Sequence, residues 1–162
     1  MQTEIRPYRR SDKTQCLYAF KSNVPQYFTE GEIEDFDRFL EMMGAENDET
    51  DRKKNTSYFV VVYENEIIGC GGFGDKDNTN IISLAWGLIH QSFHKKGYGE
   101  KLLSYRLEEV KKRFPESPLV IDTTQYSYGF FEKFGFKTTK ITHDFYEPGM
   151  HRYDMTYCYE KI

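Results

Sequence analysis

Apolar and polar residues recur along the chain with periods that predict both strands and helices. The longest nearly continuous apolar run, residues 81–89, predicts a strand that crosses the core of a domain. A glycine-containing loop follows, and beyond it apolar residues recur at spacings of four, three and four, which is typical of one buried helix face; they are Leu103, Leu107, Val110 and Phe114. The middle of the chain therefore predicts a strand, a loop and a helix in succession.

The part of the chain before this centre predicts a strand and two helices. Residues 3–8 alternate weakly and predict a strand, and Ser11 is placed to cap a short helix. Thr29 and Glu32 form a capping box for a second helix, which we expect to end at Gly44 in the C′ position.

A hairpin is predicted directly before the central strand. Residues 58–63 are β-branched and aromatic, residues 67–73 return after a short turn, and the polar residues 45–57 that precede them are expected to form an exposed loop. Gly87 lies inside the central strand and predicts a β-bulge there.

The elements predicted after the central helix are a strand at 119–123, a short helix at 125–134 and strands at 136–142 and 152–160. A helical connection between two strands of one sheet implies that they run parallel. The order β-α-α-β-β-β-α-β-α-β-β therefore predicts an α/β fold, a single domain over residues 1–162 whose central mixed sheet is flanked by helices.

The start of the central helix predicts an anion site. Gly97 and Gly99 allow the backbone to approach a ligand closely, and the first-turn N–H groups of a helix lack partners within it. Lys95, Lys96 and Lys101 add positive charge at the same end, which favours phosphate. The alternative is a plain loop whose glycines only permit a tight turn.

Composition excludes several classes of function. The chain has 162 residues and a net charge of -4, which argues against a nucleic-acid-binding face. Cys16, Cys70 and Cys158 show no CxxC spacing, and no HExxH occurs, so we expect no metal. No run reaches the roughly 18 apolar residues of a membrane span and the N-terminus lacks a signal-peptide core, so we expect a cytoplasmic protein that binds no membrane.

Two segments carry a family resemblance. Residues 88–103 read LIHQSFHKKGYGEKLL and residues 130–136 read FFEKFGF. With the order of elements, they resemble the GCN5-related N-acetyltransferases (GNAT). The loop of that family runs Arg or Gln, two residues, Gly, one residue, Gly or Ala, so Gly97 and Gly99 match and His94 takes the first place. The later helix of the family carries a tyrosine where this chain has Phe131.

The resemblance implies an acetyl-CoA-dependent N-acetyltransferase that moves an acetyl group directly to a primary amine of a small molecule or peptide; it is compatible with a homodimer. It also implies the pyrophosphate on the backbone of residues 95–101, the pantetheine arm between the central strand and the strand 119–123, and a backbone N–H near Leu88 or Ile89 that meets the oxyanion. The residues expected to contact acetyl-CoA are Leu88, Ile89, His90, His94, Lys95, Lys96, Gly97, Tyr98, Gly99, Glu100, Lys101, Thr124 and Phe131.

The catalytic groups are less well defined because Phe131 cannot protonate the leaving thiolate. Tyr128 and Tyr126 are candidate substitutes on the same helix, and the spacing of Tyr128 from Phe131 brings it closer to the same helix face. The alternatives are that both tyrosines only pack and that the thiolate leaves unaided. His90 is the candidate base, since the central strand contains no acid; the alternatives are a structural His90, a contribution from Asp122, or a proton path through water.

We expect the acceptor pocket to be built from the segment 23–34 and the last hairpin, with Tyr27, Phe28, Tyr146 and His151 as its walls. Their alternative role is ordinary core packing. A competing function is a non-catalytic acyl-CoA-binding regulatory module, suggested by Phe131 and by the missing strand glutamate. A nucleotide-binding protein is disfavoured because neither GxxxxGK[ST] nor GxGxxG occurs.

Overall fold

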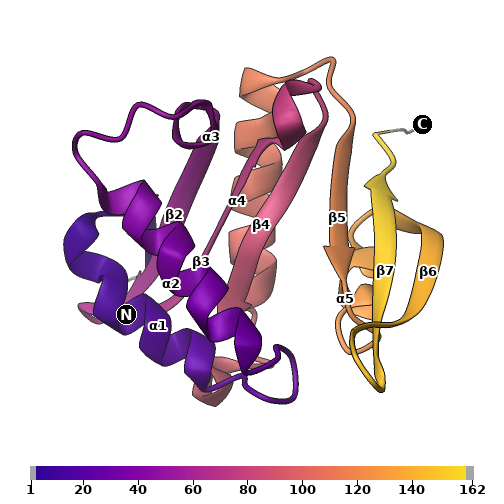
Figure 1. Ribbon diagram of the computed structural model, residues 1–162, viewed down its shortest axis with the longest axis horizontal. Helices are drawn as coiled ribbons and strands as arrows, with labels where there is room; N and C mark the ends of the chain where they lie inside the picture. Colours follow the sequence, from indigo (N-terminus) through magenta and orange to yellow (C-terminus); the bar gives the residue numbers. More distant parts are fainter. Residues whose placement is uncertain (1–2, 160–162) are drawn as a thin grey trace.

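One seven-stranded sheet carries the fold, in the order β1-β2-β3-β4-β5-β7-β6 (Figure 1). The computed structural model describes residues 3–159. The strands are β1 (Thr3–Pro7), β2 (Thr56–Tyr63), β3 (Glu66–Asp75), β4 (Ile82–Ile89), β5 (Leu119–Thr123), β6 (Phe136–Glu147) and β7 (Met150–Tyr157). β4 and β5 are parallel, as predicted, and the other neighbouring strands are antiparallel.

Helices cover both faces of the first part of the sheet. α1 (Lys13–Lys21) and α2 (Gly31–Gly44) lie in front of β2, β3 and β4 in Figure 1, α4 (Tyr98–Arg113) lies behind, and α5 (Tyr128–Lys133) lies behind β5 and β7. Within the described chain, no helix covers the front of β5, β7 and β6. This arrangement confirms the predicted α/β fold class with a mixed sheet flanked by helices. The boundaries of a domain over residues 1–162 stay a prediction.

Several predicted element ends differ from the structure. Part of the segment 45–57 is helical, because α3 (Asp51–Lys54) is capped at Thr50, whose hydroxyl accepts a hydrogen bond from the Lys53 N–H. The last two strands lie at 136–147 and 150–157, and residue 160, the predicted end of the last strand, lies outside the described residues.

The caps of the first two helices also differ. Ser11 lies inside a 3-10 turn, and Asp12 is the N-cap of α1. The capping box of α2 forms in one direction, since the Glu32 carboxylate accepts from the Thr29 N–H at 2.8 Å. The C′ prediction for Gly44 is wrong: it is the last residue of α2, and a Cβ there would lie 3.2 Å from the Arg10 Cα, so its role is to allow close approach.

An aromatic cluster fills the space between α1, α2 and the sheet. Its rings are Phe20, Phe28, Phe36, Phe39, Tyr58 and Trp86, and the Phe20 and Phe36 rings lie 4.7 Å apart. Trp86 reaches this cluster from β4, so the core on this face is tied to the middle of the central strand.

The predicted bulge is present in β4. Gly72 of β3 pairs with Ala85 and Cys70 pairs with Leu88, so two residues of β4 oppose one of β3. Trp86 has a φ of 45°, which L-residues rarely adopt. Its carbonyl oxygen accepts a hydrogen bond of 2.7 Å from the buried Tyr58 hydroxyl, which holds the bulge in place. Among residues 3–159, no helix is long and apolar enough to cross a membrane.

Candidate active site

The central feature of the site is an opening between β4 and β5. The two parallel strands pair only at Ile82 with Leu119 and at Ser83 with Val120. β4 then continues to Ile89 and β5 to Thr123, and these later residues of the two strands do not pair with each other. Ligands of open α/β sheets bind at the carboxyl ends of such strands, where neighbouring connections diverge.

The start of α4 borders this opening and is built to hold an anion. Gly97 has a φ of 89°, and a Cβ there would meet nothing within 4 Å, so the approach to the backbone is open. Lys101 makes the first intrahelical bond, to the Gly97 carbonyl at 3.1 Å, which leaves the three N–H groups before it without helical partners. Lys95, Lys96 and Lys101 are exposed beside them. These groups suit a phosphate-like anion.

The end of β4 is fixed by two side chains from other segments. The Ile89 carbonyl contacts the His94 Nε2 at 2.8 Å and accepts from the Asn23 amide at 3.0 Å. Leu88 and Ile89 are buried. Sequence reasoning placed His94 in the loop but did not find Asn23, because its partner lies 66 residues away.

His90 makes a local hydrogen bond. Its Nδ1 accepts from the Ser92 N–H at 3.0 Å, and its ring stacks on Tyr18 at 5.1 Å. A neutral imidazole that accepts at Nδ1 carries its proton on Nε2, so this geometry uses the lone pair that a base would need. Its catalytic role stays a prediction.

The two tyrosines near α5 have different surroundings. Tyr128 stacks on Tyr153 at 4.3 Å, in the core cluster that also contains the buried Phe131. Tyr126 is 51% exposed and lies edge-on to Tyr27 at 6.2 Å. Tyr27 in turn lies edge-on to the His94 ring at 5.4 Å. Tyr126 therefore belongs to a row of rings that joins the ends of β5 and β4.

Thr124, Glu100 and Tyr98 are three further predicted cofactor residues. The buried Thr124 hydroxyl accepts from the Tyr126 N–H at 3.2 Å and shapes the turn after β5. Tyr98 packs against Phe93, and Glu100 is exposed in the first turn of α4.

Acidic groups gather on the front of the sheet beside the opening. The Tyr146 hydroxyl donates to the Asp122 carboxylate at 2.8 Å, and burial followed by the Asp122 charge raises the pKa of Tyr146. Burial also raises the pKa of Glu32, against the two Thr29 hydrogen bonds that lower it, and the charges of Asp35 and then of Asp122 raise it further. The charge of Asp122 on β5 therefore acts on Glu32 on α2. No local pattern in the sequence indicates this effect, since Glu32 has an obvious capping role.

Phe28 and His151, the other predicted walls of the acceptor pocket, make contacts that support the fold. Phe28 packs against Phe20 at 4.4 Å within the aromatic cluster. The His151 Nδ1 accepts from the Asp144 N–H at 2.9 Å, and the His151 N–H donates to Gln125 at 2.8 Å, which joins the last hairpin to the turn after β5.

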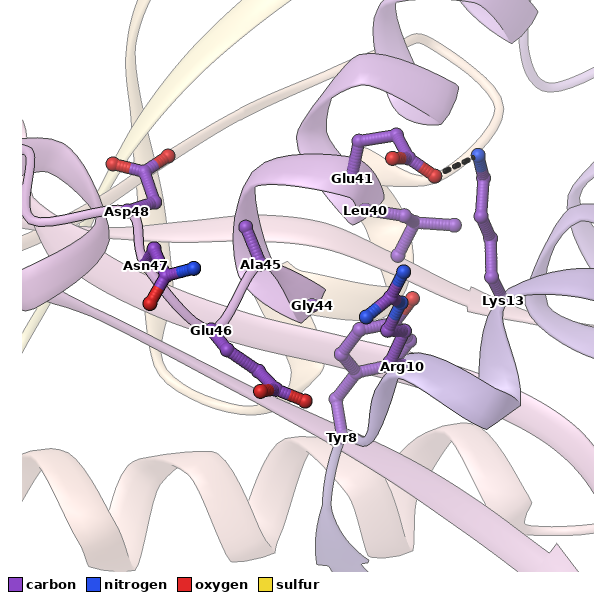
Figure 2. A pocket seen from close by; sticks show the side chains of 10 residues that line it. All are labelled: Tyr8, Arg10, Lys13, Leu40, Glu41, Gly44, Ala45, Glu46, Asn47 and Asp48. Atoms are coloured by element: carbon purple, nitrogen blue, oxygen red, sulfur yellow. Dashed lines mark hydrogen bonds and ion pairs between the residues drawn. The ribbon is translucent and has the colours of Figure 1, made fainter.

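Two pockets lie outside the strand opening. One of about 310 Å³ follows the uncovered face of β5 and β7; it is lined by Asp77, Thr79, Ile81, Val120, Ile121, Asp122, Thr139, Asp154, Met155 and Thr156. The other, of about 290 Å³, lies between the end of α2 and the segment after β1, with lining side chains of both charges (Figure 2). The first shares Asp122 with the acidic region and extends it. The second lies beside β1, three strands away from β4.

Within residues 3–159, no three His, Cys, Asp or Glu side chains are grouped so that they could hold a metal ion.

Comparisons with known proteins agree with this geometry. A family model described as an acetyltransferase (GNAT) domain matches residues 24–158. No curated protein matches the chain significantly in sequence. A GNAT-family structure from Desulfovibrio desulfuricans is similar at a TM-score of 0.77, with 17% identity over 96% of this chain and 98% of that chain.

Two further solved structures share the fold. The ribosomal-protein-S18-alanine N-acetyltransferase from Escherichia coli matches at a TM-score of 0.76, with 11% identity over 99% of this chain and 96% of that chain. The paia N-acetyltransferase from Thermoplasma acidophilum, in complex with coenzyme A, matches at 0.71, with 17% identity over 98% of this chain and 100% of that chain.

The fold and the family match together define an acyltransferase, the predicted class of enzyme. The chain belongs to the GNAT family of acetyltransferases, which confirms the resemblance read from its two motifs.

Proposed function

We propose that the protein transfers the acetyl group of acetyl-CoA to a primary amine of a small molecule or peptide. The observation that carries this proposal is the opening between β4 and β5 beside the uncapped start of α4. The Thermoplasma structure of the same fold holds coenzyme A, which supports the choice of donor. In this proposal the backbone of residues 95–101 holds the pyrophosphate, and the arm lies between β4 and β5.

The reaction requires a neutral amine. An amine with a pKa of about 10.4 loses its proton at pH 7 at a cost of about 4.6 kcal/mol, so a nearby base matters. Its nitrogen then bonds to the acetyl carbon, the carbon–sulfur bond breaks, and the sulfur leaves with the electron pair. The proton of the amine nitrogen passes to a base, for which our candidates are the carboxylates of Glu32 and Asp122 beside the predicted imidazole of His90.

The acceptor side of the proposed site is acidic and aromatic. Glu32 and Asp122 attract a cationic amine, while Tyr27 and Tyr146 supply flat walls on either side of the opening. We therefore propose an acceptor that is positively charged in solution. A cytoplasmic location and a homodimer stay predictions.

An amine panel tests this function by release of the coenzyme A thiol. Polyamines, peptides with free N-termini and neutral aromatic amines are each supplied with acetyl-CoA, and the cationic amines are expected to react fastest. Asp122→Asn and Glu32→Gln should each lower kcat/KM for them and change its dependence on pH.

Calorimetric binding of coenzyme A is measured in the same samples. Binding without turnover across the panel would favour a regulatory module that binds acyl-CoA, and no binding at all would contradict both functions.

A further inference from the structure

Arg106, in the middle of α4, is a buried arginine that lacks an acidic partner. It is 3% exposed, and within residues 3–159 no carboxylate forms an ion pair with it. Its Nη1 donates to the Gly72 carbonyl at 3.3 Å, and its buried Nε has no hydrogen-bond partner. A guanidinium has five N–H donors, so much of its capacity is unused.

The side chain nevertheless remains charged. Burial lowers the pKa of Arg106 to about 10, which still leaves it protonated at neutral pH. A buried charge without a counter-charge destabilises the folded state. The position is therefore suited to a negative charge that is present only when a ligand is bound or reacts.

The guanidinium lies against the open part of β4. A Cβ on Gly87 would be 2.7 Å from the Arg106 Nη2, and a Cβ on Gly71 would be 3.3 Å from its Cζ. The two glycines thus provide the space that the guanidinium fills. Gly87 is exposed and belongs to the bulge, beyond the last pair of β4 with β5. The positive charge consequently lies directly behind the edge of the opening.

Neither of the titratable groups that act on Arg106 is a carboxylate; they are Tyr58 and Cys70. Burial raises the pKa of the Tyr58 hydroxyl, so this group stays protonated at neutral pH. The Cys70 thiol is buried and shares a hydrogen bond with the buried Cys16. On α4 itself the neighbour packed against Gly71 is the apolar Leu102.

We propose that Arg106 stabilises the thiolate of coenzyme A as it leaves. The inference rests on the proposed function, because it requires the thioester to lie in the strand opening. When the amine nitrogen bonds to the acetyl carbon and the carbon–sulfur bond breaks, the electron pair stays on sulfur, and a fixed positive charge nearby lowers the energy of that anion. This chain has Phe131 where a tyrosine would act as the general acid, and in this way it can release the thiolate without a proton donor.

The test is a titration of the thiol of bound coenzyme A, followed by thiolate absorbance in the ultraviolet. A Cys158→Ser background removes the exposed protein thiol, and samples with desulfo-coenzyme A provide the blank. An opposite charge at close range lowers a pKa by about 1–3 units. The thiol bound to the protein is therefore expected to titrate at least about one unit below free coenzyme A, a tenfold change in its ionisation constant.

Three variants separate charge from packing. Arg106→Met should return the thiol pKa to that of free coenzyme A and lower kcat by about tenfold or more, with little change in KM for acetyl-CoA. Arg106→Lys keeps a charge and should retain part of both effects. Leu102→Met repacks the neighbouring buried position and should change neither.

A normal thiol pKa in the unmodified protein, or an equal shift in Arg106→Met, would overturn the inference. The first of these results needs no variant to fold. If coenzyme A fails to bind by calorimetry, the proposed function itself is contradicted, which distinguishes the two failures.

Discussion

At the scale of single residues, the role of a glycine or of an arginine depends on its surroundings. Gly97 and Gly149 both have positive φ and open space where a Cβ would lie, whereas Gly44 has ordinary helical geometry and a close neighbour. Arg106 differs from the other arginines in the same way, through its surroundings rather than its type.

Gly97→Ala should weaken the binding of coenzyme A by at least about tenfold, or ~1.4 kcal/mol, because the methyl group occupies the approach to the α4 backbone. The left-handed conformation also costs about 1–2 kcal/mol of stability for alanine. Gly149→Ala is the matched control, since it has a similar φ of 87° in the last hairpin. Calorimetry should show normal binding for the control and thermal denaturation should show a similar loss for both variants; equal binding by the two variants would place the pyrophosphate elsewhere.

Glu32→Gln should change how stability depends on pH. The folded pKa of Glu32 is raised by burial above its usual value of 4.5, so its contribution to stability is fully present below that pH and is lost as pH rises through the folded pKa. Glutamine keeps the acceptor oxygen for Thr29 but cannot ionise. Chemical denaturation between pH 4 and 7 should therefore show the variant gaining stability relative to the original protein as pH rises, and a gain in the opposite direction would contradict the raised pKa.

At the scale of elements, local patterns were sufficient to predict most of the architecture. The apolar run and Gly87 predicted β4 and its bulge, and Gly97 and the helix stripe predicted α4. The apolar pattern of α4 did not indicate that Arg106 is buried. Arg106 lies four residues after Leu102 and four before Val110, and both of these are buried. A charged residue at this helical spacing from apolar neighbours could have indicated a buried arginine.

What the sequence could not supply are contacts between distant segments. The contacts of Asn23 with Ile89, Tyr146 with Asp122 and Gly44 with Arg10 depend on how distant elements lie against one another, which no local period encodes.

The bulge of β4 depends on a single hydroxyl. Tyr58→Phe leaves the Trp86 carbonyl without its 2.7 Å partner and should cost about 1–3 kcal/mol. Tyr8→Phe is the control: its ring lies 5.8 Å from that of Tyr58, but its buried hydroxyl has no partner. Denaturant unfolding should find the control neutral or more stable, and a loss of equal size in both variants would mean that the bond does not hold the bulge.

The tyrosines beside α5 are expected to be dispensable for proton transfer. General acid catalysis is worth about 10²- to 10⁴-fold, and we expect neither Tyr126→Phe nor Tyr128→Phe to lose that much, because the proposed thiolate leaves with the help of Arg106. Phe131→Tyr should likewise give no gain, since Phe131 is buried among Phe130 and Phe136. Steady-state kcat values decide this; a large fall for Tyr126→Phe alone would identify it as the acid.

At the scale of the whole molecule, no helix of the described chain covers the front of β5, β7 and β6 beside the opening between β4 and β5 (Figure 1). In the proposed function the donor meets lysines and backbone N–H groups, and the acceptor meets Glu32 and Asp122. In that proposal the two substrates are separated by charge.

The short pairing of β4 with β5 has a consequence for cooperative unfolding. Two residue pairs are a weak seam, so the two parts of the sheet are joined mainly by the apolar cluster on α4, where Leu103 and Val110 meet Phe73, Ile121 and Met155. Leu103→Ala should cost about 2–5 kcal/mol and should also uncouple the two parts.

Hydrogen exchange should then show the amides of β5, β6 and β7 losing protection before those of β1, β2 and β3. Leu40→Ala, equally buried but in the front cluster, should leave exchange in β5 to β7 unchanged. Uniform loss in both variants would mean that the molecule opens as one unit. Selective loss in Leu103→Ala would mean that the cooperativity of the fold depends on one helix that spans the gap between β4 and β5.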